Sequence, residues 1–134
     1  YGSHSFVLDP ADLGQIDGSL NLEGCGISEV DGIEHCRNVR ILNIAFNDIS
    51  NIFELSSLPQ LEEIYASNNC ISDISPLSEH DFLEIVDLSE NDIEDISPLL
   101  GLGRLQFADL RDNPVQNKEL LTELRARGVI VLYS

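Results

Sequence analysis

Methionine and tryptophan are absent from the 134-residue sequence, and basic residues are scarce. Seven lysines and arginines stand against 24 acidic residues, which gives a formal net charge of −17 at pH 7. Residues 41–103 hold thirteen carboxylates and no basic residue apart from His80. Because nucleic acids and anionic membranes need a basic binding surface, we expect neither as a partner. An acidic surface fits a basic protein partner, a bound cation or solubility alone.

Cysteine is too scarce for a disulfide framework, because Cys25, Cys36 and Cys70 form no C-x-x-C pair. No apolar run reaches the length of a membrane-spanning helix, and no signal peptide is visible. Residues 1–4 read as the remnant of a cloning tag, so the natural N-terminus is left open. Length and an apolar share of 43% predict a single domain over 1–134.

A period of 22 residues runs through the chain. Asn47, Asn69, Asn91 and Asn113 follow one another at this interval, and one further step back reaches Cys25. With these residues as position 9 of each unit, positions 4, 6, 11, 14 and 17 are apolar almost throughout. Positions 4 and 6 alternate as in a strand, whereas the later positions follow the three-residue spacing of a 3-10 or irregular return. Each unit is therefore a predicted strand, turn and return, and stacked units share one core.

Position 9 needs a side chain that bonds backbone groups where the strand turns, and asparagine offers both a donor and an acceptor. We expect cysteine to replace it in the first unit. The predicted ladder of structural turns is Cys25, Asn47, Asn69, Asn91 and Asn113.

Two units contain the identical segment Asp-Ile-Ser-Pro-Leu, at 73–77 and 95–99. In these segments Ser75 and Ser97 are expected as helix N-caps, with Pro76 and Pro98 at the first helical position. Together with the segment Gly-Ile-Ser-Glu-Val-Asp-Gly-Ile-Glu-His-Cys at 26–36, they resemble leucine-rich repeats of the 22-residue type, most of all those of bacterial internalin-related proteins.

This resemblance implies an α/β repeat solenoid. It would be a right-handed coil of five repeats over 17–116, with short parallel strands on the concave face and 3-10 or irregular returns on the convex face. The sequence also predicts a capping segment at each end of the coil. The N-terminal cap covers 1–16 with a short helix over about 10–16, and the C-terminal cap covers 117–134 with a helix over 118–127 and a strand over 129–133.

Positions 3, 5, 7 and 8 of each unit are expected to point outward from the concave strands. Large apolar groups there are informative, because the core does not need them, although strand propensity alone is a competing explanation. Acidic side chains and a single basic one, Arg111, are expected beside these apolar groups. The predicted partner-binding residues are Ile41, Phe46, Tyr65, Ile85, Asp87, Phe107, Asp109 and Arg111.

We expect no enzymatic activity, no cofactor and no metal site. Asp87 and Asp109 could suggest a paired-carboxylate hydrolase, but a five-turn coil offers no cleft that excludes water. The turn aspartates contain no calcium-loop motif. Cys25, His35 and Cys36 lie in different parts of the coil, so we expect Cys25 and Cys36 to be core residues and not zinc ligands, while Cys70 is expected to be an exposed free thiol.

The function expected from the fold and the exposed apolar residues is a monomeric protein-binding scaffold that uses its concave face. The partner would be a protein or peptide, with a basic partner as the sharper hypothesis. Two alternatives stay open: a spacer or assembly domain of a larger protein, and an intracellular regulator. The family resemblance favours an exported or cell-surface location over a cytoplasmic one.

Overall fold

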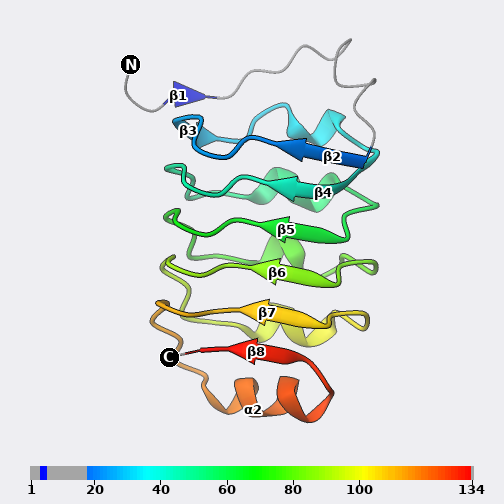
Figure 1. Cartoon of the computed structure of the whole chain (residues 1–134), viewed down its shortest axis with the longest axis vertical. Coiled ribbons are helices and arrows are strands. Elements are labelled where there is room, and N and C mark those ends of the chain that lie inside the picture. The colour runs from blue at the N-terminus through cyan, green and yellow to red at the C-terminus, as the bar shows by residue number, and fades with distance from the viewer. Residues whose placement is uncertain (1–3, 6–17, 134) are drawn as a thin grey trace.

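The structure, a computed structural model, describes residues 4–5 and 18–133. Six short parallel strands are stacked into one sheet (Figure 1). Neighbouring strands from β2 to β7 pair at an offset of 22 residues, as in Leu42 with Ile64 and Ile64 with Val86, except that Gly18 at the start of β2 pairs with Val39. The period found in the sequence is therefore the structural repeat. In sheet order, the strands are β2 (Gly18–Asn21), β4 (Val39–Asn43), β5 (Glu63–Tyr65), β6 (Ile85–Asp87), β7 (Phe107–Asp109) and β8 (Ile130–Leu132).

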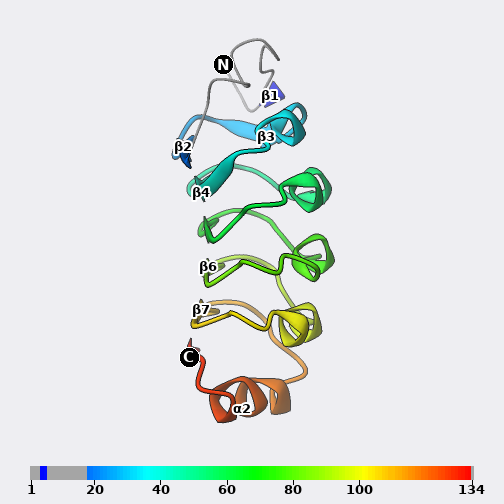
Figure 2. The same ribbon diagram turned by 90° about the vertical axis from the view of Figure 1, so that its right-hand side faces the viewer.

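Short 3-10 helices form the side opposite the strands (Figure 2). The side chains between the two sides are aliphatic and buried at the predicted inward positions. Position 1 of the repeats, for which the sequence provided no expectation, is buried as well, in Val39, Leu61, Leu83 and Leu105. The 3-10 helices are η1 (Ile33–His35), η2 (Phe53–Ser57), η3 (Ser75–Leu77) and η4 (Ser97–Gly101).

At the C-terminal end, helix α2 (Glu119–Ala126) packs below β8 and buries Leu121 and Leu124 against the core. Arg125 Nη2 donates to the carbonyl oxygen of Val131 at 2.9 Å, on the edge strand β8. In the described part of the chain, no helix is long and apolar enough to span a bilayer. Near the other end, β1 (His4–Ser5) pairs in parallel with β3 (Ile27–Glu29). The predicted helix over about 10–16 lies outside the described residues.

The predicted serine caps are wrong. Ser75 and Ser97 are the first residues of η3 and η4, and no side-chain cap bond is made. Instead, the preceding aspartates accept the N–H groups of these serines, Asp73 and Asp95 each at 2.9 Å. The aspartate two residues earlier is the better placed acceptor, because its carboxylate reaches forward over the turn.

Candidate partner-binding face

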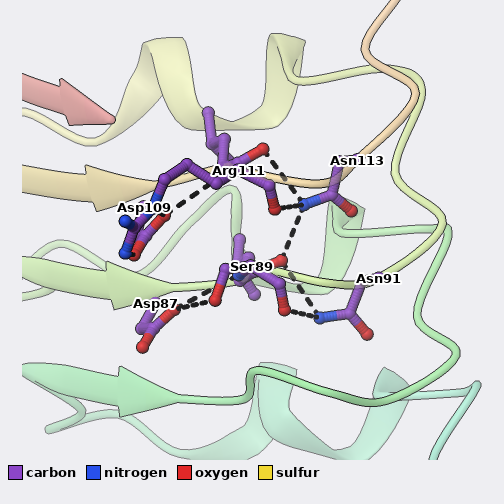
Figure 3. Close-up of polar contacts among 8 residues, drawn as sticks. Asp87, Ser89, Asn91, Asp109, Arg111 and Asn113 are labelled. Atoms are coloured by element: carbon purple, nitrogen blue, oxygen red, sulfur yellow. Dashed lines mark hydrogen bonds and ion pairs between the residues drawn. The ribbon is translucent and has the colours of Figure 1, made fainter. Parts of the chain in front are cut away.

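A buried asparagine holds the turn after each of strands β4 to β7. Oδ1 of Asn69 accepts the backbone N–H of Ile49 at 3.0 Å, and its Nδ2 donates to the carbonyl oxygen of Ile44 at 3.0 Å. Both partners belong to the preceding repeat, so the side chain joins two units. Asn91 and Asn113 make the equivalent bonds. Figure 3 shows their amide groups bonded to the carbonyl oxygens of the turns, such as those of Ser89 and Arg111.

Cys25 departs from this ladder. Its side chain is exposed, and its backbone N–H donates to Oδ1 of Asn47 at 3.0 Å. The prediction that Cys25 is a core residue is therefore wrong, but its thiol keeps one bond of the ladder: Sγ donates to the carbonyl oxygen of Glu23 at 3.6 Å, as Asn47 Nδ2 donates to that of Ala45 at 3.1 Å. A thiol has one weak donor and cannot supply the amide's several bonds. Cys36 is buried and Cys70 is exposed, in agreement with the sequence.

Position 3 of the strands forms an exposed apolar row. Ile41 on β4 is 37% exposed, and Ile85 and Phe107 are partly exposed neighbours in register on β6 and β7. The row continues on β8 with Ile130, which is 61% exposed and pairs with Phe107. Sequence reasoning missed Ile130 because it follows Phe107 by 23 residues and so breaks the period. We call Ile41, Ile85, Phe107 and Ile130 the apolar row; on β5, Glu63 occupies the same position.

Position 5 has a structural task on most strands. Its Oδ1 atom accepts the backbone N–H two residues further on, at 3.0–3.2 Å. This bond is an Asx turn, and it needs an acceptor oxygen but no charge. The residues that make it are Asn21, Asn43, Asp87 and Asp109.

Asp109 is not the open carboxylate that the sequence suggested, because it is only 4% exposed and is paired with Arg111 (Figure 3). Arg111 Nε donates to Oδ1 at 3.0 Å, and its Nη2 donates to Oδ2 at 2.6 Å. Burial favours a higher pKa for Asp109, but the hydrogen bonds and charge of Arg111 outweigh it and hold the pKa below its usual value. Both oxygens are thus engaged in an internal ion pair, which speaks against an acid–base role with Asp87.

Asp87 lies at the equivalent place one strand earlier, and among the described residues no guanidinium is hydrogen-bonded to it, although its charge helps to raise the pKa of Arg111. The Ser89 hydroxyl donates to its Oδ1 at 2.9 Å, on the same atom that accepts the Ser89 N–H. Among the residues that the structure describes, no hydrogen-bond donor reaches Oδ2. One carboxylate oxygen of Asp87 therefore stays open on the strand face.

Tyr65 on β5 is in register with Asp87 on β6. The Tyr65 hydroxyl donates to Oε1 of Glu63 at 2.5 Å. This bond, partial burial and the charges of Glu63 and Asp87 raise the pKa of Tyr65 to about 12. The side chain is consequently a neutral phenol that has the carboxylates of Glu63 and Asp87 as neighbours.

Positions 7 and 8 do not all point outward from the strands as predicted. At position 7, Ala45 and Ser67 are buried. Position 8 lies in the turn beyond the strand, where Phe46 has a φ of 58° and is 58% exposed. The left-handed backbone is a property of the repeat, because Asn68, Glu90 and Asp112 share it, but it is unfavourable for a bulky residue, which the core here does not need. Phe46 therefore stays a candidate contact, at the edge of the face and not on it.

The two histidines outside the N-terminal residues differ in their surroundings. His35 is exposed, whereas His80 is buried with Nε2 2.8 Å from the carbonyl oxygen of Leu55. Burial lowers the pKa of His80, so the ring is neutral and its Nε2–H donates to that carbonyl. Over residues 4–5 and 18–133, no three His, Cys, Asp or Glu side chains are grouped so as to hold a metal ion.

A polar hollow of about 420 Å³ lies away from the strand face, between the first turns and returns. Asp31 and Glu54 both line it. Within the described residues, Oε2 of Glu54 is buried without a hydrogen-bond partner. Burial, together with the charges of Asp31 and Glu34, raises the pKa of Glu54.

Comparisons with known proteins agree with this architecture. Residues 37–79 match the family model for leucine-rich repeats in two copies. Internalin F of Listeria monocytogenes superposes with a TM-score of 0.67 at 21% identity, covering 91% of this chain and 42% of that one. A leucine-rich-repeat protein of Leptospira interrogans superposes with a TM-score of 0.62 at 21% identity, covering 85% of this chain and 36% of that one. The functional domain of Listeria internalin J superposes with a TM-score of 0.66 at 18% identity, covering 81% of this chain and 27% of that one.

The chain thus spans less than half the length of each of these structures. No curated protein matches the sequence. Residues 37–79 thus match leucine-rich repeats, and the described chain has the leucine-rich-repeat fold, similar to that of the internalins.

Proposed function

We propose that the chain is a protein- or peptide-binding module that holds its partner on the strand face. Leucine-rich-repeat folds commonly serve as interaction scaffolds, and the single observation that carries the proposal here is the apolar row. Its side chains project from four strands although the core does not need them. Exposed apolar groups gathered in this way are typical of contact surfaces. Tyr65 adds an aromatic ring on the strand between β4 and β6.

The size of the face supports a modest partner. Six strands at the usual spacing give a face about 24 Å long. That length suits one peptide segment or a small protein interface, and we expect no large assembly on it.

The charge of the face supports a basic protein partner. The same fold binds nucleic acid elsewhere, since a matching structure is a complex of TLR13 with single-stranded RNA, at 24% identity and a TM-score of 0.64. In this chain, however, Asp87 and Glu63 lie on the strand face, and Arg111 is tied to Asp109. Nucleic acid would be repelled by these carboxylates, whereas basic side chains would be attracted.

A pull-down from the native source tests the proposal. The wild type is compared with Tyr65→Ala/Phe107→Ala, and the matched control is Phe53→Ala, whose ring is 66% exposed on the return side. Truncating a central aromatic anchor commonly costs about 2 kcal/mol or more. We therefore expect the double variant to lose the partner and the control to keep it. A partner that survives the double change and is lost on Phe53→Ala would place binding on the returns and refute the proposal.

We further propose a monomer that works outside the cell, as the internalin-like fold suggests. Helix α2 supports the monomer, because it covers the C-terminal end of the core that another copy could otherwise extend. Light scattering after size-exclusion chromatography checks this, and a dimer would contradict it. Should no partner depend on the strand face, the spacer role becomes the better explanation.

A further inference from the structure

We propose that Asp87 is the docking point for an arginine side chain of the partner. The inference rests on the proposed function, in which the strand face holds a protein, and it names the chemistry of one partner residue. Its basis is that the chain already shows such a docking on the next strand, with its own arginine.

The two sites are equivalent by register. Asp87 and Asp109 pair across β6 and β7, and each accepts the N–H of the residue two positions on. In the last repeat that residue is Arg111, whose guanidinium engages both carboxylate oxygens of Asp109. In the repeat before, it is Ser89, which reaches only Oδ1 of Asp87. The coil thus shows how a guanidinium lies against the carboxylate at this position, and it leaves one of two such carboxylates without it.

The negative charge of Asp87 is not needed for the turn. Asn21 and Asn43 accept the same backbone bond in the first two repeats with a neutral amide. An aspartate does here what asparagine does elsewhere, and it carries a charge in addition. Arg111 feels this charge from the next strand but is bonded to Asp109, so Oδ2 of Asp87 is open to an external cation.

The neighbours of Asp87 favour arginine over lysine. Tyr65 presents a neutral ring from the adjacent strand, and a planar guanidinium can stack on such a ring while it forks onto a carboxylate. Ile85 and Phe107 of the apolar row lie on β6 and β7, the strands that carry Asp87 and Asp109. Exposed ion pairs alone are weak, so the arginine should act together with apolar partner residues seated on that row.

The probes for the test are linear peptides selected on the wild type from a random phage-displayed library. Their affinities are measured by fluorescence anisotropy, with arginine or its neutral isostere citrulline in the peptide. We expect selected peptides to require arginine, and citrulline to weaken binding roughly tenfold, as for loss of a charge-assisted pair. Asp87→Asn keeps the turn acceptor and should cause a similar loss. Asp81→Asn removes the same charge from an exposed site elsewhere and should cause none.

A second variant tests the geometry. Ser89→Arg copies the last repeat into the one before it and supplies Asp87 with an internal guanidinium. We expect it to fold and melt like the wild type but to bind the arginine peptides at least tenfold more weakly. Ser57→Arg, which adds the same charge to the exposed return side, is the matched control and should bind with less change.

The possible failures are distinguishable. Peptides that need Tyr65 and Phe107 but bind Asp87→Asn and Ser89→Arg like the wild type would overturn the arginine site and leave the proposed function standing. Equal losses on Asp87→Asn and Asp81→Asn would also overturn it, because only the general field would then act. If no selected peptide depends on Tyr65, Phe107 or Asp87, both the proposed function and the arginine site are wrong.

Discussion

At the scale of single residues, the buried asparagines show how one side chain can hold two repeats together. Each has an acceptor and a donor that satisfy backbone groups of its own unit and of the preceding one. Alanine would leave these buried groups without partners, and water cannot easily replace the amide there.

Asn69→Ala and Asn91→Ala should therefore each lower the free energy of unfolding by about 1–3 kcal/mol. Urea denaturation measures the effect. The matched control is Asn38→Ala, an exposed asparagine with no side-chain hydrogen bond to the described residues, which should change stability by less than about 0.5 kcal/mol. Equal effects at exposed and buried asparagines would mean that the ladder bonds do not stabilise the fold.

Glu54 is a residue whose charge should oppose folding. Partial burial, with Asp31 and Glu34 nearby, raises its pKa above the ordinary 4.5 in the folded state. The folded state therefore binds the proton more tightly than the unfolded one, and the penalty is present in full above the raised pKa. It fades as the pH falls toward the ordinary value. An acidic residue on a return suggests a surface position whose substitution leaves stability unchanged, but Glu54 is not such a position.

Glu54→Gln should raise the melting midpoint at pH 7 and give a smaller gain at about pH 4, where the wild-type carboxyl is largely neutral. Thermal melts at the two pH values measure this. Glu62→Gln removes a charge from a residue outside the hollow and serves as control. A gain of the same size at both pH values would show that the charge of Glu54 is not the cause.

At the scale of elements, the sequence predicted the strands and returns well because the inward positions repeat. An aliphatic side chain fills the same inward position at Ile64 and at Val86, so spacing alone located both strands. Local turn chemistry was harder to predict. Asp73 and Ser75 both suit the start of a return, and only the direction of the Asp73 carboxylate decides which one accepts a bond.

The turn after β4 offers a prediction on strain. Phe46 has a left-handed backbone in this turn, and Asn68 and Asp112 have the same conformation at the same position of other repeats. Phe46→Asn should raise the free energy of unfolding by about 0.5–1 kcal/mol, since asparagine adopts this backbone more easily and little burial is lost. Phe53→Asn, at an equally exposed ring without positive φ, is the control for urea denaturation and should bring no gain. A loss of stability with Phe46→Asn would indicate that the ring packs usefully in the turn.

At the scale of the whole molecule, the fold follows from the sequence more fully than the contact face does. Periodicity locates the strands of the five repeats, β2 and β4 to β7. It cannot tell that Arg111 pairs with Asp109 and not with Asp87, because both aspartates occupy the same position. Nor can it find Ile130, which lies beyond the last regular repeat. Pairing between side chains and the irregular end of the coil are settled only in three dimensions.

The net charge of −17 acts on the molecule as a whole. Folding brings like charges together, so self-repulsion should destabilise the coil most at low ionic strength. The Debye length shrinks from about 30 Å at 0.01 M salt to about 8 Å at physiological salt, which screens carboxylates on neighbouring repeats. We therefore expect the urea midpoint to rise as sodium chloride increases over about 0.01–0.5 M.

A variant with fewer charges separates screening from other effects of salt. Glu90→Gln/Asp92→Asn/Glu94→Gln neutralises three exposed carboxylates within one repeat. It should be more stable than the wild type at low salt, and the two midpoints should converge as screening removes the repulsion that distinguishes them. Parallel curves would mean that sodium chloride stabilises both chains by a route unrelated to these charges. A wild-type midpoint that falls with salt would show that attractive pairs such as Asp109–Arg111 outweigh the repulsion, and the acidic surface would then have no measurable cost to the fold.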